Sequence, residues 1–264
     1  MPAQIPWFQI AFIIGISITI RYFLITGLAY VGFWKWKVEW SKLHRLQPKD
    51  FKATDIRREV FYSIVSLALY TAVFTVPFLS SVRPYTKLYD HVSDYGVGWW
   101  IISLLGLLVI NDTYFYWMHR FVHRPFWFQR IHRVHHLSTN PTPFAAFAFH
   151  PTEAFLEFVW IVPLFFIVPM HVGMTIVFSI ISLLFNVMGH LGVEIYPDRW
   201  RAHPVLGWLN RSTFHNDHHR LFRGNYGLYF TFWDRLMGTL REAPLPEPQQ
   251  RPLVRSMPES GIRL

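Results

Sequence analysis

The stretch Val97–His123, VGWWIISLLGLLVINDTYFYWMHRFVH, combines the two features that decide the fold. Its first part, Val97–Trp117, is apolar over the roughly 20 residues that a helix needs to cross a membrane. Its end carries His119 and His123, which are four residues apart and therefore lie on the same face of a helix. The stretch predicts a membrane helix that brings a pair of histidines to one of its ends.

Three further regions are apolar enough to enter a membrane. They are about Trp7–Trp34, about Val60–Val82 and Ala154–Met188. The third is too long for one span and contains two prolines, so we expect a hairpin of helices at about Ala154–Val168 and Val172–Met188. Arg21 interrupts the first region, and we expect its charge to reach a membrane interface. The predicted fold class is all-α, with about four to five membrane helices and a helical cap that holds a histidine-rich dimetal site.

The composition is that of a membrane protein. Of 264 residues, 52% are hydrophobic and only 16% are charged, and aromatic side chains of the kind found at lipid headgroups are abundant. The absence of cysteine excludes disulfides, iron–sulfur clusters and thiolate-ligated haem, so any metal is held by nitrogen and oxygen. The net charge of +9 is concentrated in loops beside apolar segments, which favours a membrane surface over nucleic acid as the partner.

Basic and non-basic loops alternate along the chain. The basic ones are residues 35–58, 119–153 and 190–264. The positive-inside rule places them in the cytoplasm and the N-terminus outside, as expected of a multi-pass integral membrane protein. Eleven of the 14 histidines lie in the two later basic regions, so the metal site is expected on the cytoplasmic side.

We divide the chain into three parts. They are an N-terminal membrane helix with a basic cytoplasmic loop (1–58), a catalytic membrane domain (59–241) and a tail (242–264). The tail is rich in proline and polar residues, so we expect it to be irregular.

The motif His-x-x-His-His occurs twice. Its members are His132, His135 and His136 in the first copy and His215, His218 and His219 in the second. In a helix, positions i, i+3 and i+4 lie within an arc of about 100°, so all three imidazoles of a triplet can face one point. Imidazole suits iron, copper, nickel and zinc. Histidines on a solvated helix surface are the alternative, and the repeated triplet together with the pair at 119 and 123 argues against it.

Other polar residues near these motifs are weaker candidates. His190 ends an apolar helix on the metal side, which favours a ligand role. His150 fits a ligand and a hydrogen-bonding residue at a helix N-terminus equally well. Asp112, two helical turns before His119, is expected to accept an N–H from a ligand histidine, with an interhelical hydrogen bond as the alternative. The remaining histidines, which we expect to be structural or exposed, are His44, His91, His171 and His203.

Eight to ten imidazoles are too many for one ion, because a closed zinc site takes four ligands. Two ions beside the membrane plane would suit a lipid substrate. Iron is favoured for oxygen chemistry at an unactivated C–H bond, which no side chain can attack, although these ligands do not exclude zinc.

The chain resembles the sterol desaturase and fatty acid hydroxylase superfamily over roughly residues 55–241. The resemblance rests on NDTYFYWMHR (111–120), His123, the first triplet, Thr142-Pro143-Phe144, His150-Pro151, His190 and the run from His215 to Thr239. That run, with Asn225-Tyr226-Gly227 and Trp233-Asp234-Arg235, is similar to the sterol C-5 desaturase (lathosterol oxidase) branch.

The resemblance implies a non-haem di-iron centre, molecular oxygen as co-substrate and electrons from a separate carrier protein. By motif, it implies that both triplets, His119 and His123 are ligands, with His190 as a further one. Some relatives have a second histidine near His190, where this chain has Glu194 four residues later. Either Glu194 supplies an oxygen ligand or that ion keeps an open position.

The leading interpretation is an oxygen-dependent oxidoreductase that desaturates or hydroxylates a membrane lipid, with a preference for a sterol. The alternatives are a hydroxylase of fatty acyl chains or other lipids, a membrane metal transporter, and a bis-histidine haem protein. No dinucleotide-binding fingerprint is present, which is why a separate electron carrier is expected. A bacterial inner membrane and the endoplasmic reticulum both fit the sequence.

Overall fold

The computed structural model describes residues 5–48 and 50–241, so the predicted irregular tail at 242–264 lies outside the described residues. The α-helices are α1 (Trp7–Tyr30), α2 (Val38–His44), α3 (Ala53–Thr75), α4 (Gly96–Val122), α5 (Pro125–Trp127), α6 (Arg133–His136), α7 (Pro151–Val159), α8 (Ile161–Ile167), α9 (Val172–Gly189), α10 (Ser212–Leu221) and α11 (Phe232–Leu236). Two π-helical segments, Val31–Trp36 and Phe128–His132, extend α1 and precede α6. Short 3₁₀ helices connect the rest, among them η6 (Pro143–Phe147).

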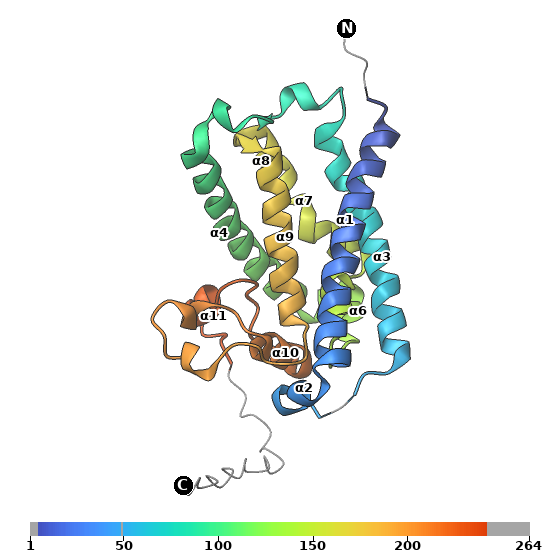
Figure 1. The fold of residues 1–264 in the computed structure, drawn as a ribbon, viewed down its shortest axis with the longest axis vertical. Helices are drawn as coiled ribbons and strands as arrows, with labels where there is room; N and C mark the ends of the chain where they lie inside the picture. Colours follow the sequence, from blue (N-terminus) through green and yellow to red (C-terminus); the bar gives the residue numbers. More distant parts are fainter. Residues whose placement is uncertain (1–4, 49, 242–264) are drawn as a thin grey trace, which may run out of the picture.

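The long helices α1, α3, α4 and α9 run side by side and form the body of the molecule (Figure 1). Among the described residues, four segments are long and apolar enough to cross a membrane: Trp7–Trp36, Ala53–Phe78, Gly96–Val122 and Val172–Gly189. The short helices α2, α6, α10 and α11 lie together at one end of this body (Figure 1). The predicted all-α membrane architecture with a helical cap is confirmed.

The first arm of the expected hairpin differs from the prediction. Instead of one helix over Ala154–Val168, the chain forms α7 and α8, which are nine and seven residues long. Proline has no N–H, and its ring clashes with the carbonyl four residues earlier. That carbonyl belongs to Val159, where α7 ends, so Pro163 accounts for the break. Neither short helix is long enough to cross a bilayer alone.

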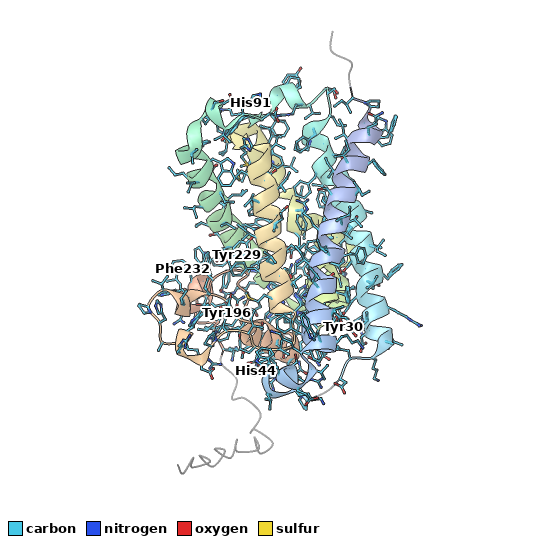
Figure 2. The ribbon with its side chains drawn as sticks, in the orientation of Figure 1. Tyr30, His44, His91, Tyr196, Tyr229 and Phe232 are labelled. Atoms are coloured by element: carbon cyan, nitrogen blue, oxygen red, sulfur yellow. The ribbon has the colours of Figure 1, made fainter. Side chains whose placement is uncertain are left out.

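The end of the molecule away from the cap is closed by a small sheet. Strand β1 (Leu88–Tyr89) pairs in parallel with β2 (Met170–His171). His171 Nε2 lies 3.0 Å from the carbonyl oxygen of Asp90. Figure 2 shows His91 at this end and His44 at the cap end. His91 and His171 therefore lie far from the cap, as expected of structural histidines.

The core that supports the cap lies where α1, α3, α9 and η6 meet. Tyr22 is completely buried there and stacks on Phe147, with the ring centroids 5.3 Å apart. Its hydroxyl donates a hydrogen bond to the carbonyl of Phe144 at 2.8 Å, and Ser63 Oγ donates to the same oxygen at 3.0 Å. Two long helices thus hold η6 in place, and η6 leads directly into α7.

Candidate metal centre

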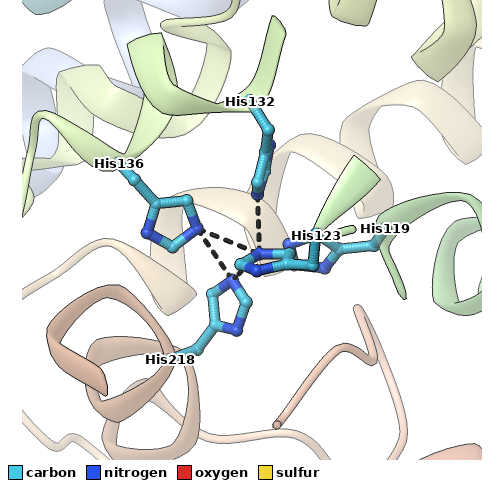
Figure 3. A group of neighbouring side chains, drawn as sticks. All are labelled: His119, His123, His132, His136 and His218. Carbon is cyan, nitrogen blue, oxygen red and sulfur yellow. Dashed lines mark hydrogen bonds between the residues drawn. The ribbon is translucent and has the colours of Figure 1, made fainter. Parts of the chain in front are cut away.

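Nine of the predicted site histidines gather at the cap end in two neighbouring groups. The five-histidine group contains His119, His123, His132, His136 and His218 (Figure 3), and the four-histidine group contains His135, His190, His215 and His219. Within each group, every residue offers one ligand atom, and these atoms all lie within 4.8 Å of one another. All nine side chains are buried except His123, which is half-buried.

Each His-x-x-His-His triplet is divided between the two groups. His132 and His136 belong to the five-histidine group, whereas His135 belongs to the four-histidine group. In the second triplet the numbers are reversed: only His218 belongs to the five-histidine group, whereas His215 and His219 belong to the four-histidine group. The expectation that all three imidazoles of a triplet face one point is therefore wrong. Adjacent helical residues point about 100° apart, so neighbours such as His135 and His136 face different centres while i and i+4 face the same one.

The four-histidine group forms at the end of α9, where the chain needs a glycine. A Cβ on Gly189 would lie 3.1 Å from the His215 ring, which is closer than ordinary contact. The glycine thus lets the end of α9 approach α10. His190 follows directly, and its Nε2 lies 3.1 Å from that of His215 and 3.2 Å from that of His219.

Backbone carbonyls fix the orientation of several rings through Nδ1. In the five-histidine group, Nδ1–H of His119, His123 and His218 donates to the carbonyls of Tyr226, Phe222 and Gly224 at 3.0, 3.1 and 2.7 Å. In the four-histidine group, His190 donates to the Asn186 carbonyl at 2.7 Å. With Nδ1 protonated, the Nε2 lone pair of each ring is free to bind a metal.

The loop after α10 adopts left-handed backbone conformations that direct these carbonyls inward. Phe222, Gly224 and Asn225 have φ angles of 59°, 73° and 55°. Such a conformation is uncommon for a phenylalanine and persists only where its surroundings hold it. Asn225 contributes to that hold, since its Nδ2 donates to the Phe214 carbonyl at 3.0 Å.

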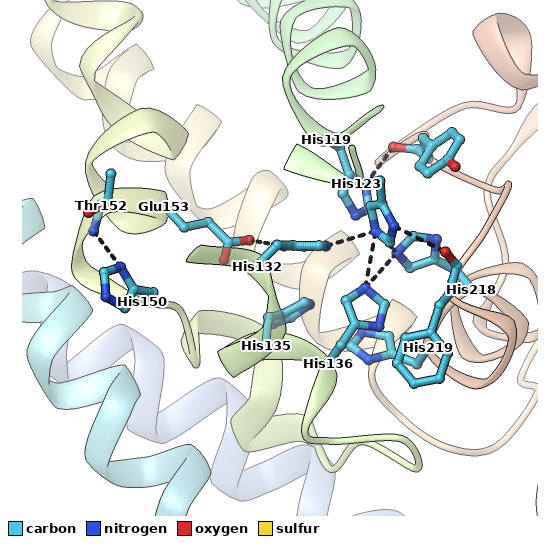
Figure 4. Close-up of polar contacts among 12 residues, drawn as sticks. His119, His123, His132, His135, His136, His150, Thr152, Glu153, His218 and His219 are labelled. Atoms are coloured by element: carbon cyan, nitrogen blue, oxygen red, sulfur yellow. Dashed lines mark hydrogen bonds and ion pairs between the residues drawn. The ribbon is translucent and has the colours of Figure 1, made fainter. Parts of the chain in front are cut away.

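Glu153 is a site residue that the sequence interpretation missed. Its Oε1 accepts a hydrogen bond from Nδ1 of His132 at 2.5 Å (Figure 4). Both side chains are only 1% exposed. This is the carboxylate–histidine contact expected behind a metal ligand. Burial raises the pKa of the Glu153 carboxyl, and the nearby Glu157 raises it further. An acidic residue at the start of an apolar helix, in His-Pro-Thr-Glu, was the signal that could have identified it.

Asp112 does not perform the role expected of it. Its Oδ1 accepts hydrogen bonds from the backbone amides of Tyr229 and Phe230 at 2.8 and 3.2 Å, and no hydrogen bond joins it to a histidine among the described residues. The leading expectation placed its partner on the face of its own helix, whereas these amides lie 117 and 118 residues away in sequence, as the alternative of a contact outside that helix allows. Asp112 therefore fixes the loop after α10 to α4.

His150 and Glu194 lie outside both groups. His150 Nδ1 accepts a hydrogen bond from the Thr152 amide at 3.2 Å and caps α7 (Figure 4). Glu194 Oε2 accepts from the Thr213 amide and hydroxyl at 3.1 and 2.6 Å, in the first turn of α10. A carboxylate is favourable there because of the helix dipole. Both side chains accept hydrogen bonds at helix N-termini and belong to neither histidine group.

The chemistry of the rings fits two cations. Burial lowers the pKa of His132, His135, His136, His215, His218 and His219 well below the ordinary value, and neighbouring imidazoles lower it further. The pKa of His190 falls to about 4, chiefly through burial. The rings are thus neutral, the form that binds metals.

The spacing of the ring nitrogens also points to cations. Nε2 of His123 and Nε2 of His218, whose Nδ1 atoms carry the protons, lie 3.0 Å apart. Two lone pairs aimed at each other at that distance repel unless they share a positive charge. Iron, zinc, copper and nickel all accept imidazole nitrogen.

A large apolar cavity leads from the helical body to these rings. It has a volume of about 710 Å³ and lies among α1, α3, α7, α8 and α9, touching α4 at Asn111 and Phe115. A smaller pocket of about 20 Å³ is lined by histidines of both groups. Four residues line both spaces, and they are Phe115, Glu157, Asn186 and Leu228. The large cavity is thus walled by α1 and α3 as well as by α7, α8, α9 and part of α4.

Sequence comparisons give the chain its relatives. The model of the family described as fatty acid hydroxylase matches residues 104–239. The chain is 35% identical to the lathosterol oxidase of Mus musculus over 197 residues, which are 73% of this chain and 63% of that protein. It is 32% identical to a Delta(7)-sterol 5(6)-desaturase of Gibberella zeae over 216 residues, covering 80% and 64% of the two chains. A Delta(7)-sterol 5(6)-desaturase of Aspergillus fumigatus is 31% identical over 224 residues, covering 77% and 67%. No solved structure gives a significant match.

Proposed function

Since the chain belongs to the fatty acid hydroxylase family, we propose that it is a membrane oxidase that uses O₂ and externally supplied electrons to desaturate or hydroxylate a lipid. The chain spans about 63% of the length of the mouse lathosterol oxidase, so the activity of the whole relative enters here as a proposal. The observation that carries the proposal is the meeting of the two histidine groups with a cavity of about 710 Å³ inside the membrane body.

The nine histidines would hold two iron ions, five at one and four at the other. Bound iron supplies the means to activate O₂ and remove hydrogen from an unactivated carbon. Carbonyls and Glu153 orient the rings, so the site is arranged before substrate arrives. Phe115 and Leu228 border the opening to the histidines and exclude water from it, while Glu157 and Asn186 are the polar groups there. A lipid can thus present one carbon without leaving the apolar cavity.

A sterol is the proposed substrate, and desaturation the proposed outcome. Support comes from the printed activities of the relatives, which are a lathosterol oxidase and Delta(7)-sterol 5(6)-desaturases. Hydroxylation of an acyl chain is the second candidate, favoured by the description of the matching family. A metal transporter is disfavoured, because both histidine groups take members from α6 and α10, which lie at the same end of the long helices (Figure 1).

The position of the histidines in the cap also supports proposals about the electron donor and about the membrane in which the protein lies. We propose that a reduced carrier protein docks on the cap, where Arg124, Arg130 and Arg133 are exposed beside the five-histidine group. Charge alternation in the loops supports a cytoplasmic position for the cap. The eukaryotic sterol desaturases among the relatives favour the endoplasmic reticulum over a bacterial membrane.

The test supplies sterols and acyl lipids in parallel to the purified protein, with ¹⁸O₂ and an electron-donor system. A desaturated sterol without label supports the proposal, and a labelled hydroxyl group supports hydroxylation. The absence of any oxygen-dependent product from both lipid classes would refute both. Metal analysis of the same sample should find two iron ions per chain.

A further inference from the structure

Arg21 lies in the middle of a membrane helix without an acidic partner among the described residues. Its Nε donates a hydrogen bond to the Ser17 carbonyl at 3.2 Å, while its Nη1 is covered and has no hydrogen-bond partner. The sequence predicted that its charge would reach an interface. Instead the side chain is half-buried and lines the large cavity. A charged group inside a membrane protein is costly, which makes such a residue a functional candidate.

The position of Arg21 along the cavity is informative. The cavity wall uses α1 residues from Ile10 onward, and Arg21 is the last of them toward the cap. The other arginine of the wall, Arg83, is satisfied, because its guanidinium bonds Asp90 at 2.9 Å and the Leu88 carbonyl at 2.5 Å. Glu157 also lines the wall, but it forms no ion pair with Arg21 within 4.0 Å. Among these charged groups of the wall, Arg21 is the cation whose guanidinium lacks a full set of hydrogen-bond partners.

A guanidinium with an unused N–H in an apolar cavity is stabilised most by an oxygen acceptor on whatever fills that cavity. We propose that Arg21 binds the oxygen-bearing end of the lipid, a hydroxyl or a carboxylate, and so positions the carbon that meets the histidines. This inference rests on the proposed function, because it concerns the substrate of the same site. It adds a requirement that the lipid carry an acceptor oxygen at a fixed distance from the reacting carbon.

Ligand pairs that differ in one oxygen group test the proposal. Binding is measured on the purified full-length protein in nanodiscs, without turnover, for a sterol and its analogue lacking the hydroxyl. The second pair is a fatty acid and its methyl ester. The wild-type protein should prefer the member with the hydroxyl or carboxylate in at least one pair by about 10- to 100-fold, the range expected for a hydrogen bond to a charged group.

Variants assign that preference to Arg21. Arg21→Met should abolish it, and Arg21→Lys should keep part of it. Arg83→Met is the matched control, since it removes a wall arginine whose bonds are already made, and it should leave the preference unchanged. Arg21→Met should also unfold at a temperature no lower than the wild type when no lipid is added, because it removes a charge with an unused donor. Should Arg21→Met fail to fold, Arg21→Gln, which keeps a donor without the charge, should still reduce the preference.

The results separate the two lipid classes and the two proposals. Loss of preference only in the sterol pair assigns a hydroxyl, and loss only in the acid pair assigns a carboxylate. An unchanged preference in Arg21→Met, or no preference in the wild type, overturns the inference. Because binding is measured without oxygen or electrons, a protein that binds as expected but oxidises neither lipid refutes the proposed function alone.

Discussion

The two histidine groups lie side by side but depend on different parts of the chain. The five-histidine group is oriented from outside, by carbonyls of Phe222, Gly224 and Tyr226 and by the Glu153 carboxylate. The four-histidine group is built around the end of α9, where His190 bonds a carbonyl of its own helix. The first thus relies on a loop and the second on a helix terminus. Changes in the loop should therefore affect one ion before the other.

The largest expected effect comes from removing one ligand from each group. His135→Ala leaves three histidines in its group, whereas His123→Ala leaves four, the number of ligands in a closed zinc site. We expect His135→Ala to lose one ion per chain and at least about 100-fold in activity, since losing even an outer partner of a ligand costs 10- to 100-fold. His123→Ala should keep both ions and part of the activity. Metal content per chain, measured by mass spectrometry, checks both.

His203→Ala is the control for these variants. His203 accepts hydrogen bonds from the amides of Val205 and Leu206 at 3.2 and 3.1 Å and belongs to neither group. Its replacement should change neither metal content nor activity. The structure gives the two groups different numbers of ligands. Equal metal loss in His135→Ala and His123→Ala would contradict that difference.

A smaller effect is expected from the carboxylate behind His132. In Glu153→Ala the Nδ1–H of His132 loses its acceptor, whereas the amide oxygen of Glu153→Gln can still accept it. We expect metal affinity at the five-histidine group to fall by about 10- to 100-fold in Glu153→Ala and less in Glu153→Gln. Thr152→Ala, on the same turn, is the control. Titration of the metal-free protein with Fe²⁺ resolves the weaker site, and wild-type affinity in Glu153→Ala would contradict the assignment.

The smallest expected effect tests whether the five-histidine group depends on the loop after α10. A Cβ on Gly224 would lie 2.6 Å from the Thr239 carbonyl, so Gly224→Ala must displace the carbonyl that bonds His218. We expect metal affinity at the five-histidine group to fall by several-fold up to about 10-fold, below the cost of losing an outer partner outright. Gly238→Ala is matched to it, with a φ of 65° but no atom within 4 Å of the added Cβ. If the two variants bind metal equally, backbone strain and not the displaced carbonyl is the cause.

The sequence predicted which histidines gather but not how they divide. All nine histidines that gather were proposed as ligands, eight from the His-x-x-His-His and His-x-x-x-His spacings and His190 from its place at the end of an apolar helix. The division depends on how α6 faces α10, where Nε2 of His136 lies 3.1 Å from that of His218. That relation joins residues 82 positions apart, and no pattern within either segment specifies it.

Carboxylates were harder to assign than histidines. Asp112 was expected to act on a neighbour of its own helix, yet its partners are backbone amides of a distant loop. Glu153 was overlooked because its partner, His132, precedes it by 21 residues across a turn. A carboxylate accepts hydrogen bonds from any donor that packs against it, so its role follows from tertiary structure. The four long helices, by contrast, could be predicted from length and hydropathy alone.

The division of each triplet has a consequence for synthesis of the chain. Neither group is complete until α10 has been made, because each contains members from both triplets. His218 follows His136 by 82 residues, a delay of about 4 to 16 s at about 5–20 residues per second. During that interval the first triplet and its preceding pair exist without their partners from α10, and an ion that arrives early finds an incomplete shell. Loading of the two proposed ions in their final geometry would therefore be post-translational, or at the earliest coincide with emergence of the loop at Phe222–Tyr226.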